Sequence, residues 1–153
     1  MLTWITALGL LLALTGCSGA PDPQQEAREW LDRGLTQFQS QQYDQAIVSL
    51  SRAVALAPHH AGAHNLLGVV YRFKYYQVRD PDLKKKEMAA YQKALEADPK
   101  YWPAHLNLGA AYYYEGDKAT AARFFRQALE LQPEHPDKDQ LLEMIAEGEV
   151  PGE

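Results

Sequence analysis

The chain has 153 residues, which is enough for one compact domain. Its hydrophobic share of 46% and its charged share of 23% are those of a globular protein, so the composition excludes a wholly disordered chain. The net charge is −5, and seven acids against one lysine in residues 134–153 contribute −6, so the residues before them sum to +1. This balance offers no broad basic surface and argues against DNA or RNA as a partner.

The first predicted element is a signal peptide over residues 1–16. These residues carry no charged side chain and are almost wholly apolar from Leu2 to Leu14. Such a run is shorter than the roughly 20 residues of a membrane-spanning helix and is typical of a signal peptide. It ends in Leu14-Thr15-Gly16-Cys17, which resembles the bacterial lipobox. The resemblance implies cleavage before Cys17 and attachment of lipid to its thiol; the alternative is an ordinary secretory signal with an incidental cysteine.

The sequence around Cys17 predicts where the protein resides. Cys17 is the only cysteine, so no intramolecular disulfide can form. Two or three acyl chains anchor a protein stably, at about 0.8 kcal/mol per buried CH₂ group. We expect a lipid-anchored protein of the bacterial envelope that faces the periplasm. Ser18 stands where enteric-like bacteria place the Asp that retains lipoproteins at the inner membrane, which favours the outer membrane. Residues 17–26 predict a flexible tether.

Three copies of one spacing pattern follow over residues 27–135. In the first and third copies Gly, Ala, Ala and Pro recur at intervals of 12, 7 and 5 residues, and the second copy contains seven additional residues. Small residues let two antiparallel helices approach closely, and proline ends the second helix of each pair. The residues at these positions are Gly34, Ala46, Ala53 and Pro58, then Gly68, Ala94 and Pro99, then Gly109, Ala121, Ala128 and Pro133.

With Trp30, Leu67-Gly68 and Leu108-Gly109 at fixed places in the copies, the pattern resembles the tetratricopeptide repeat family. The copies span residues 27–60, 61–101 and 102–135. The resemblance implies an all-α fold, a right-handed solenoid of three helix hairpins. The sequence departs from the family pattern at Arg33, where Leu is usual, at Lys118, where a Tyr is usual, and at Glu87, where a small residue is expected.

The seven additional residues of the second copy are close to two helical turns of 3.6 residues each. They predict lengthened helices over residues 61–77 and 81–97, with Asp80 as N-cap and Pro81 as first helical residue. A loop bulge within residues 75–86 is the alternative. The projecting tip is basic and is either simply solvated or a contact site for an acidic partner or anionic lipid headgroups. Its contact residues would be Arg79, Lys84, Lys85 and Lys86.

Residues 136–153 predict a capping helix followed by an acidic tail. Between Asp137 and Glu147, Leu141, Leu142 and Ile145 fall on one side and acids on the other. The last repeat of a solenoid needs such a solubilising cap.

No grouping of residues in the chain is typical of a catalytic site. The sequence has no glycine-rich phosphate loop and no zinc-type cysteine pair. His64 and His105 occupy the same repeat position as Trp30, so we expect both imidazoles to pack between helices rather than to bind a metal. We therefore expect no enzymatic activity, no metal and no cofactor.

The family resemblance implies a binding groove on the concave face, lined by the first helix of each hairpin. The basic clamp with which some members hold a C-terminal carboxylate is missing, because Leu31, Leu35, Leu66 and Pro103 occupy its places. The apolar and amide-bearing groove predicts a helix or an extended peptide with hydrophobic anchors as ligand. Alternatively, the cap helix or a second copy of the chain covers part of this face. The predicted groove residues are Leu31, Leu35, Phe38, Asn65, Leu66, Val69, Arg72, Phe73, Leu106, Asn107, Ala110, Tyr113 and Tyr114.

Together these features predict a membrane-anchored adaptor that binds a protein partner, as yet unidentified, in the bacterial envelope. The resemblance leaves two alternatives open. One is a pilotin-like assembly factor for type IV pili or another envelope machine. The other is a structural lipoprotein that associates with itself as a homodimer.

Overall fold

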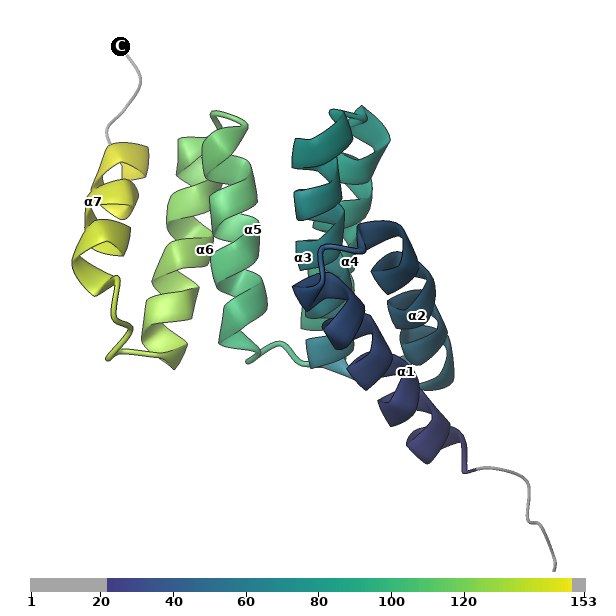
Figure 1. The fold of residues 1–153 in the computed structure, drawn as a ribbon. Helices are drawn as coiled ribbons and strands as arrows, with labels where there is room; N and C mark the ends of the chain where they lie inside the picture. The colour runs from purple at the N-terminus through teal and green to yellow at the C-terminus, as the bar shows by residue number, and fades with distance from the viewer. Residues whose placement is uncertain (1–21, 150–153) are drawn as a thin grey trace, which may run out of the picture.

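The computed structural model describes residues 22–149, and this part of the chain forms seven helices and no strand (Figure 1). The predicted signal peptide, Cys17 and residues 18–21 of the tether lie outside the described residues, as does the end of the acidic tail. Residues 23–26 were predicted as flexible tether, but they form the first turn of α1, which Asp22 caps. None of the described helices is both long enough and apolar enough to cross a membrane. The helices are α1 (Pro23–Gln39), α2 (Tyr43–Leu56), α3 (Ala61–Val78), α4 (Pro81–Ala97), α5 (Trp102–Tyr114), α6 (Lys118–Leu131) and α7 (Lys138–Glu149).

The first six helices form three antiparallel hairpins that stand side by side (Figure 1). Each hairpin turns through a residue in the left-handed region, namely Gln41 and Arg79 at φ 59° and Gly116 at φ 87°. All three turns lie at one end of the stack, whereas the links between hairpins and the start of α1 lie at the opposite end (Figure 1).

The helices form an inner and an outer layer. Helix α1 contacts α3 and α3 contacts α5, whereas none of the described even-numbered helices contacts the next even-numbered one. The layer whose members touch is the inner side of a curved stack, so α1, α3 and α5 line the concave face. The all-α solenoid that the family resemblance implied is the observed fold.

Three glycines set the spacing within the hairpins. A Cβ atom on Gly34 would lie 2.6 Å from Leu50 Cγ, one on Gly68 would lie 2.5 Å from the Tyr91 ring, and one on Gly109 would lie 2.5 Å from the Phe125 ring. These distances are well inside van der Waals contact, so only glycine allows each large residue to lie against the facing helix backbone. Leu50, Tyr91 and Phe125 are accordingly among the largest fully buried side chains of the described chain.

The second hairpin is lengthened by two continuous helices rather than by a loop. Helix α3 ends at Val78, and α4 begins directly after Asp80, whose Oδ1 accepts a hydrogen bond from the Asp82 amide at 3.0 Å. Pro81 is the first helical residue, as the sequence predicted. The alternative of a loop bulge within residues 75–86 is therefore wrong.

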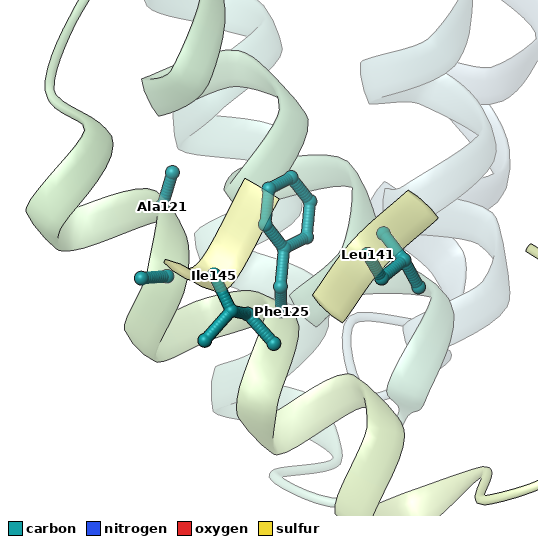
Figure 2. Close-up of a cluster of buried hydrophobic side chains, with 5 residues drawn as sticks. Ala121, Phe125, Leu141 and Ile145 are labelled. Atoms are coloured by element: carbon teal, nitrogen blue, oxygen red, sulfur yellow. The ribbon is translucent and has the colours of Figure 1, made fainter. Parts of the chain in front are cut away.

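Helix α7 closes the C-terminal end of the stack. Leu141 and Ile145 are buried and pack against Ala121 and Phe125 of α6 (Figure 2). The sequence placed Leu142 on this same apolar side, and that assignment is wrong, because its side chain is exposed. Residue 142 lies 100° around the helix from residue 141, which turns it away from α6.

The N-terminal end of the stack is covered by a charged side chain, that of Arg33, rather than by a helix. Leu67 and Leu108, the second- and third-copy counterparts of Arg33, are buried. Arg33 itself is exposed, and its guanidinium stacks over the Trp30 ring at 4.4 Å, with Arg52 over the same ring at 5.4 Å. No described hairpin precedes α1, so this departure from the repeat pattern places a cation where a leucine would be exposed to water.

Candidate peptide-binding face

Aromatic side chains cluster on the concave face near the turns of the first and second hairpins. Phe38 of α1, Tyr43 of α2 and Phe73 of α3 form a triangle with ring centroids 5.2 to 6.1 Å apart. Phe73 remains 41% exposed and Leu35 remains 39% exposed. The structure thus brings two of the predicted groove residues, Phe38 and Phe73, into contact across the inner helices α1 and α3. A third, Leu35, lies about one turn before Phe38 on α1 and is also accessible.

A cavity of about 380 Å³ lies at the other end of the same hairpin. It is open to solvent and is lined by the start of α1, the end of α2 and the start of α3. Leu31, a predicted groove residue, contributes to its mainly apolar wall together with Ala27, Leu56 and Ala63, and Arg28 and His60 also line it. Leu66, like Leu31 and Phe38, is half-buried and packs against the buried cluster that includes Leu50 and Leu67.

A chain of polar side chains crosses the middle of the face. Arg72 Nη1 donates to Asn107 Oδ1 at 3.2 Å, and Asn107 Nδ2 donates to Asn65 Oδ1 at 2.9 Å. All three side chains are half-buried. These hydrogen bonds join α3 to α5 at the junction between the second and third hairpins. The buried apolar cluster at this junction consists of alanines only, Ala61, Ala94 and Ala104. The hydrogen bonds therefore supplement a sparse apolar contact between the second and third hairpins.

Helix α7 covers part of the third-copy face. Leu106, Ala110 and Tyr113 pack against the cluster that α6 and α7 share. The Tyr113 hydroxyl donates to a carboxylate oxygen of Glu147 at 2.8 Å, and Lys118 Nζ donates to the same oxygen at 2.8 Å. The hydrogen bond to Glu147 raises the pKa of Tyr113, and the bond from Lys118 lowers the pKa of Glu147. The open part of the face therefore lies mainly on the first two hairpins.

Tyr114 is separate from the other predicted groove residues. It is largely exposed and its ring contacts only the Tyr113 ring, edge to face at 5.9 Å, among the aromatic groups of the described chain. Val69 of α3 is half-buried and lies about one helical turn before Phe73.

A buried acid lies behind the polar chain. Glu87 is fully buried where the other copies have the fully buried Ala46 and Ala121. Lys84 Nζ lies 3.3 Å from Glu87 Oε2, yet neither carboxylate oxygen has a hydrogen-bond partner among the described residues. Burial raises the pKa of Glu87, while the charges of Lys84 and Arg72 lower it. Burial also raises the pKa of the nearby Tyr91 hydroxyl, and the charge of Arg72 opposes this shift.

The basic tip differs from the prediction at one residue. Lys84 is largely buried and paired with Glu87, and it also lies 3.8 Å from Glu115, so it belongs to the hairpin interior rather than to the tip. Arg79 stacks over Tyr75 at 5.7 Å and Tyr76 at 5.6 Å. The remaining predicted tip residues, Lys85 and Lys86, are exposed, and Lys85 pairs with Asp82 at 3.0 Å.

The two histidines at the Trp30 position lie at the links between hairpins, where His105 is buried and His64 is half-buried. His64 Nε2 donates to the Pro58 carbonyl at 2.9 Å, and His105 Nε2 donates to the Pro99 carbonyl at 2.9 Å. A carbonyl can only accept, so the Nε2 atom carries the proton in both rings. Within residues 22–149, no group of three or more His, Cys, Asp or Glu side chains is arranged to hold a metal ion.

Sequence reasoning did not find the chain from Arg72 to Asn65 or the burial of Glu87. The first joins residues 35 and 42 positions apart, which no local spacing reveals. The second had a signal, because a charged residue at a small-residue position, with a lysine one turn earlier, indicates a buried ion pair.

Comparison with known families gives matches in two parts of the chain. A model described as tetratricopeptide repeat matches residues 102–135, the range of the third predicted copy, and one described as TPR repeat matches residues 34–72. The chain is similar to human RANBP2-like and GRIP domain-containing protein 1, with 35% identity over 81 residues. The match covers 53% of this chain and 4% of that relative, so the chain spans a small fraction of the relative's length.

Solved structures give the same result for the fold. The Arabidopsis OM64 TPR domain superposes with a TM-score of 0.71 at 17% identity, covering 82% of this chain and 98% of that one. The second TPR domain of human RPAP3, in complex with the HSP70 peptide SGPTIEEVD, gives a TM-score of 0.70 at 20% identity, covering 85% and 100%. At these identities the likeness concerns the fold alone. The chain therefore carries tetratricopeptide repeats and folds as a tetratricopeptide-repeat solenoid.

Proposed function

We propose that this protein is a lipid-anchored adaptor of the bacterial envelope that binds a segment of another protein on its concave face. The observation that supports this most directly is the accessible apolar surface of Leu35 and Phe73, which lies on the inner layer. Large apolar side chains exposed together on a concave surface are typical of binding sites. The RPAP3 domain of the same fold is in complex with a peptide, which supports a peptide-like ligand here.

Two exposed groove residues allow a test that spares the core. Leu35→Glu and Phe73→Glu each place a charge on the proposed binding surface, and both side chains already contact water. Val48→Glu is the matched control, because Val48 is 62% exposed and lies on the outer helix α2. Partners would be crosslinked to the full chain in its native membrane and identified by mass spectrometry. The proposal expects one partner to be lost from both groove variants and retained by the control. Equal capture by all four proteins would refute it.

Anchoring through Cys17 is the second part of the proposal, and it rests on the Leu14-Thr15-Gly16-Cys17 motif. Labelled palmitate should enter the wild-type protein and not Cys17→Ser. Label in both proteins, or in neither, would contradict lipid attachment at this residue. The outer membrane is the proposed location, and fractionation of the two membranes after expression would test it.

The fold favours one orientation for an anchored protein. Helix α1 begins at the end of the stack opposite the hairpin turns (Figure 1). The five peptide links from Cys17 to Asp22 reach at most about 18 Å, whereas the 18-residue helix α3 adds about 27 Å to the tip of the second hairpin. We therefore propose that the tip with Arg79 and Lys86 points away from the anchoring membrane and contacts an acidic protein surface rather than lipid headgroups.

A further inference from the structure

The cavity at the base of the first hairpin has an apolar floor and a polar rim. Its volume is about 380 Å³, and three of the residues that line it, Ala27, Ala53 and Ala63, are buried. The polar residues that line it, among them Arg28 and His60, are exposed. An apolar cavity of roughly 150 Å³ is large enough for a ligand of the size of benzene. The cavity at this end of the stack therefore has room for part of a hydrocarbon chain.

The second junction shows how a repeat of this chain fills the corresponding space. Tyr101 ends the second copy, as His60 ends the first, and its half-buried ring packs against the alanine cluster of that junction. A Cβ atom on Gly62, the counterpart of Arg28, would lie 3.5 Å from the Tyr101 hydroxyl oxygen. The ring of Tyr101 therefore reaches back from the link to the start of α3 and covers the alanines between them.

The third copy fills this space with a pair of rings, and the first copy leaves it open. Trp102 stands at the place of Ala27, and its ring meets that of His135 edge to face at 5.4 Å. In the first copy Ala27 is too small for such a contact. His60 turns towards its own helix, because its Nδ1 accepts a hydrogen bond from the Ala63 amide at 3.1 Å and so caps α3. Two residue choices, Ala27 and His60, thus keep the cavity open.

We propose that this cavity holds one acyl chain of the lipid on Cys17 while the protein is outside a bilayer. The proposal rests on the proposed lipid attachment and specifies where the domain receives that lipid. A hydrocarbon chain leaves water for an apolar surface with a gain proportional to the area that it buries. The core of a bilayer offers the same gain, so the chain leaves the cavity when the protein inserts into a membrane.

The point of attachment is close to the cavity along the chain. The five peptide links from Cys17 to Asp22 reach at most about 18 Å. The residues of α1 that line the cavity, from Gln24 to Leu31, lie roughly 3 to 14 Å from Asp22 along the helix axis. A group on so short a tether is present at a millimolar effective concentration. The occupant is therefore the lipid of the same chain rather than a free fatty acid or the lipid of a second copy.

The only cysteine of the chain allows a direct test, because a thiol reagent labels Cys17 alone. The mature chain from residue 17, which contains all the described helices, is alkylated with a dodecyl maleimide that carries a photoreactive diazirine at its far end. Irradiation in dilute aqueous solution, followed by mass spectrometry, then locates that end on the protein. The label is attached chemically, so the measurement does not depend on lipid attachment in the cell.

Two variants of one residue separate filling of the cavity from loss of the helix cap. His60→Tyr introduces the residue that fills the corresponding space at the second junction. His60→Asn is the matched control, because asparagine caps a helix well and is too small to fill the cavity. The location of the crosslinks in the wild type is informative without either variant.

We expect crosslinks within one chain, to the start of α1 and the end of α2, in the wild type and in His60→Asn. In His60→Tyr they should fall at least about fivefold, because the added ring excludes the chain. An excess of phosphatidylcholine vesicles should remove them from the wild type. Crosslinks to the surface of Leu35 and Phe73, crosslinks between two chains, equal yields in all three proteins or yields unchanged by vesicles would overturn the proposal.

Failure of this proposal and failure of the proposed anchor are distinguishable. Palmitate incorporation at Cys17 in cells without crosslinks to the cavity would support the anchor and overturn only the role of the cavity. Crosslinks to the cavity without palmitate incorporation would contradict the anchor and, with it, the native lipid as occupant. Neither result bears on partner binding at Leu35 and Phe73.

Discussion

Replacing Gly109 with alanine tests the close packing on which the third hairpin depends. The new Cβ atom would lie 2.5 Å from Phe125 Cδ1 and 2.6 Å from Cε1. Carbon atoms in contact are about 3.5 to 4.0 Å apart, so the ring must retreat by roughly 1 Å. The ring already packs in one buried cluster with Leu141 and Ile145 of α7, so its retreat must displace them (Figure 2).

Overpacking of this kind costs about 1 to 3 kcal/mol, and the better helix propensity of alanine returns roughly 1 kcal/mol. We therefore expect a loss of about 1 kcal/mol in the free energy of unfolding, measured by urea denaturation of the full chain followed by far-UV circular dichroism. The same substitution in a Phe125→Ala background should be stabilising, because the obstructing ring is gone and only the propensity gain remains. An equal penalty in both backgrounds, or a stabilised single variant, would refute the steric argument.

Three further outcomes follow from the described contacts. Because burial raises the pKa of folded Glu87, the native carboxyl keeps a proton that the unfolded one loses above its ordinary value of 4.5, so stability falls as pH rises through the folded pKa. Urea titrations across this range should show that slope in the wild type and not in Glu87→Gln; parallel curves would contradict the burial of this acid. Gly148→Ala would place a Cβ atom against the Lys118 carbonyl, which cannot rotate away, so hydrogen exchange of α7 amides should accelerate, whereas unchanged rates would mean that α7 is not docked there. Asp80→Ala should lower the thermal midpoint through a lost N-cap worth about 1 kcal/mol, and an unchanged midpoint would show that Pro81 alone starts α4.

The helices were predictable because each of them obeys local rules. Small residues at intervals of 12 and 7 and a proline after each pair specify hairpins without reference to any distant residue. The insertion was predictable for the same reason, since seven residues preserve the helical register at the base of the hairpin. Asp80 and Pro81 then identify the start of α4 from the sequence alone.

Contacts between hairpins were not predictable, because they depend on the angle at which one hairpin meets the next. Asn65 and Asn107 were both expected on the concave face, but nothing in the spacing showed that their amides meet or that Arg72 orients them. Leu142 was assigned to the wrong side because a short helix allows two neighbouring leucines to fit the same apolar pattern. Whether the predicted groove residues bind a partner is a separate question, which the variants of Leu35 and Phe73 address.

The ends of the solenoid set the length of ligand that its inner surface can span. Stacked Arg33 closes one end and α7 closes the other, so four helices, α1, α3, α5 and α7, delimit the surface. Directly packed helix axes lie about 8 to 10 Å apart, and these helices touch one another only sparsely, so the three spacings add up to roughly 30 Å or more. At about 3.3 Å per residue, an extended chain crosses that span in roughly nine residues or more. The surface would therefore contact a short linear segment of its partner, and the rest of a longer partner would extend beyond the surface at both ends.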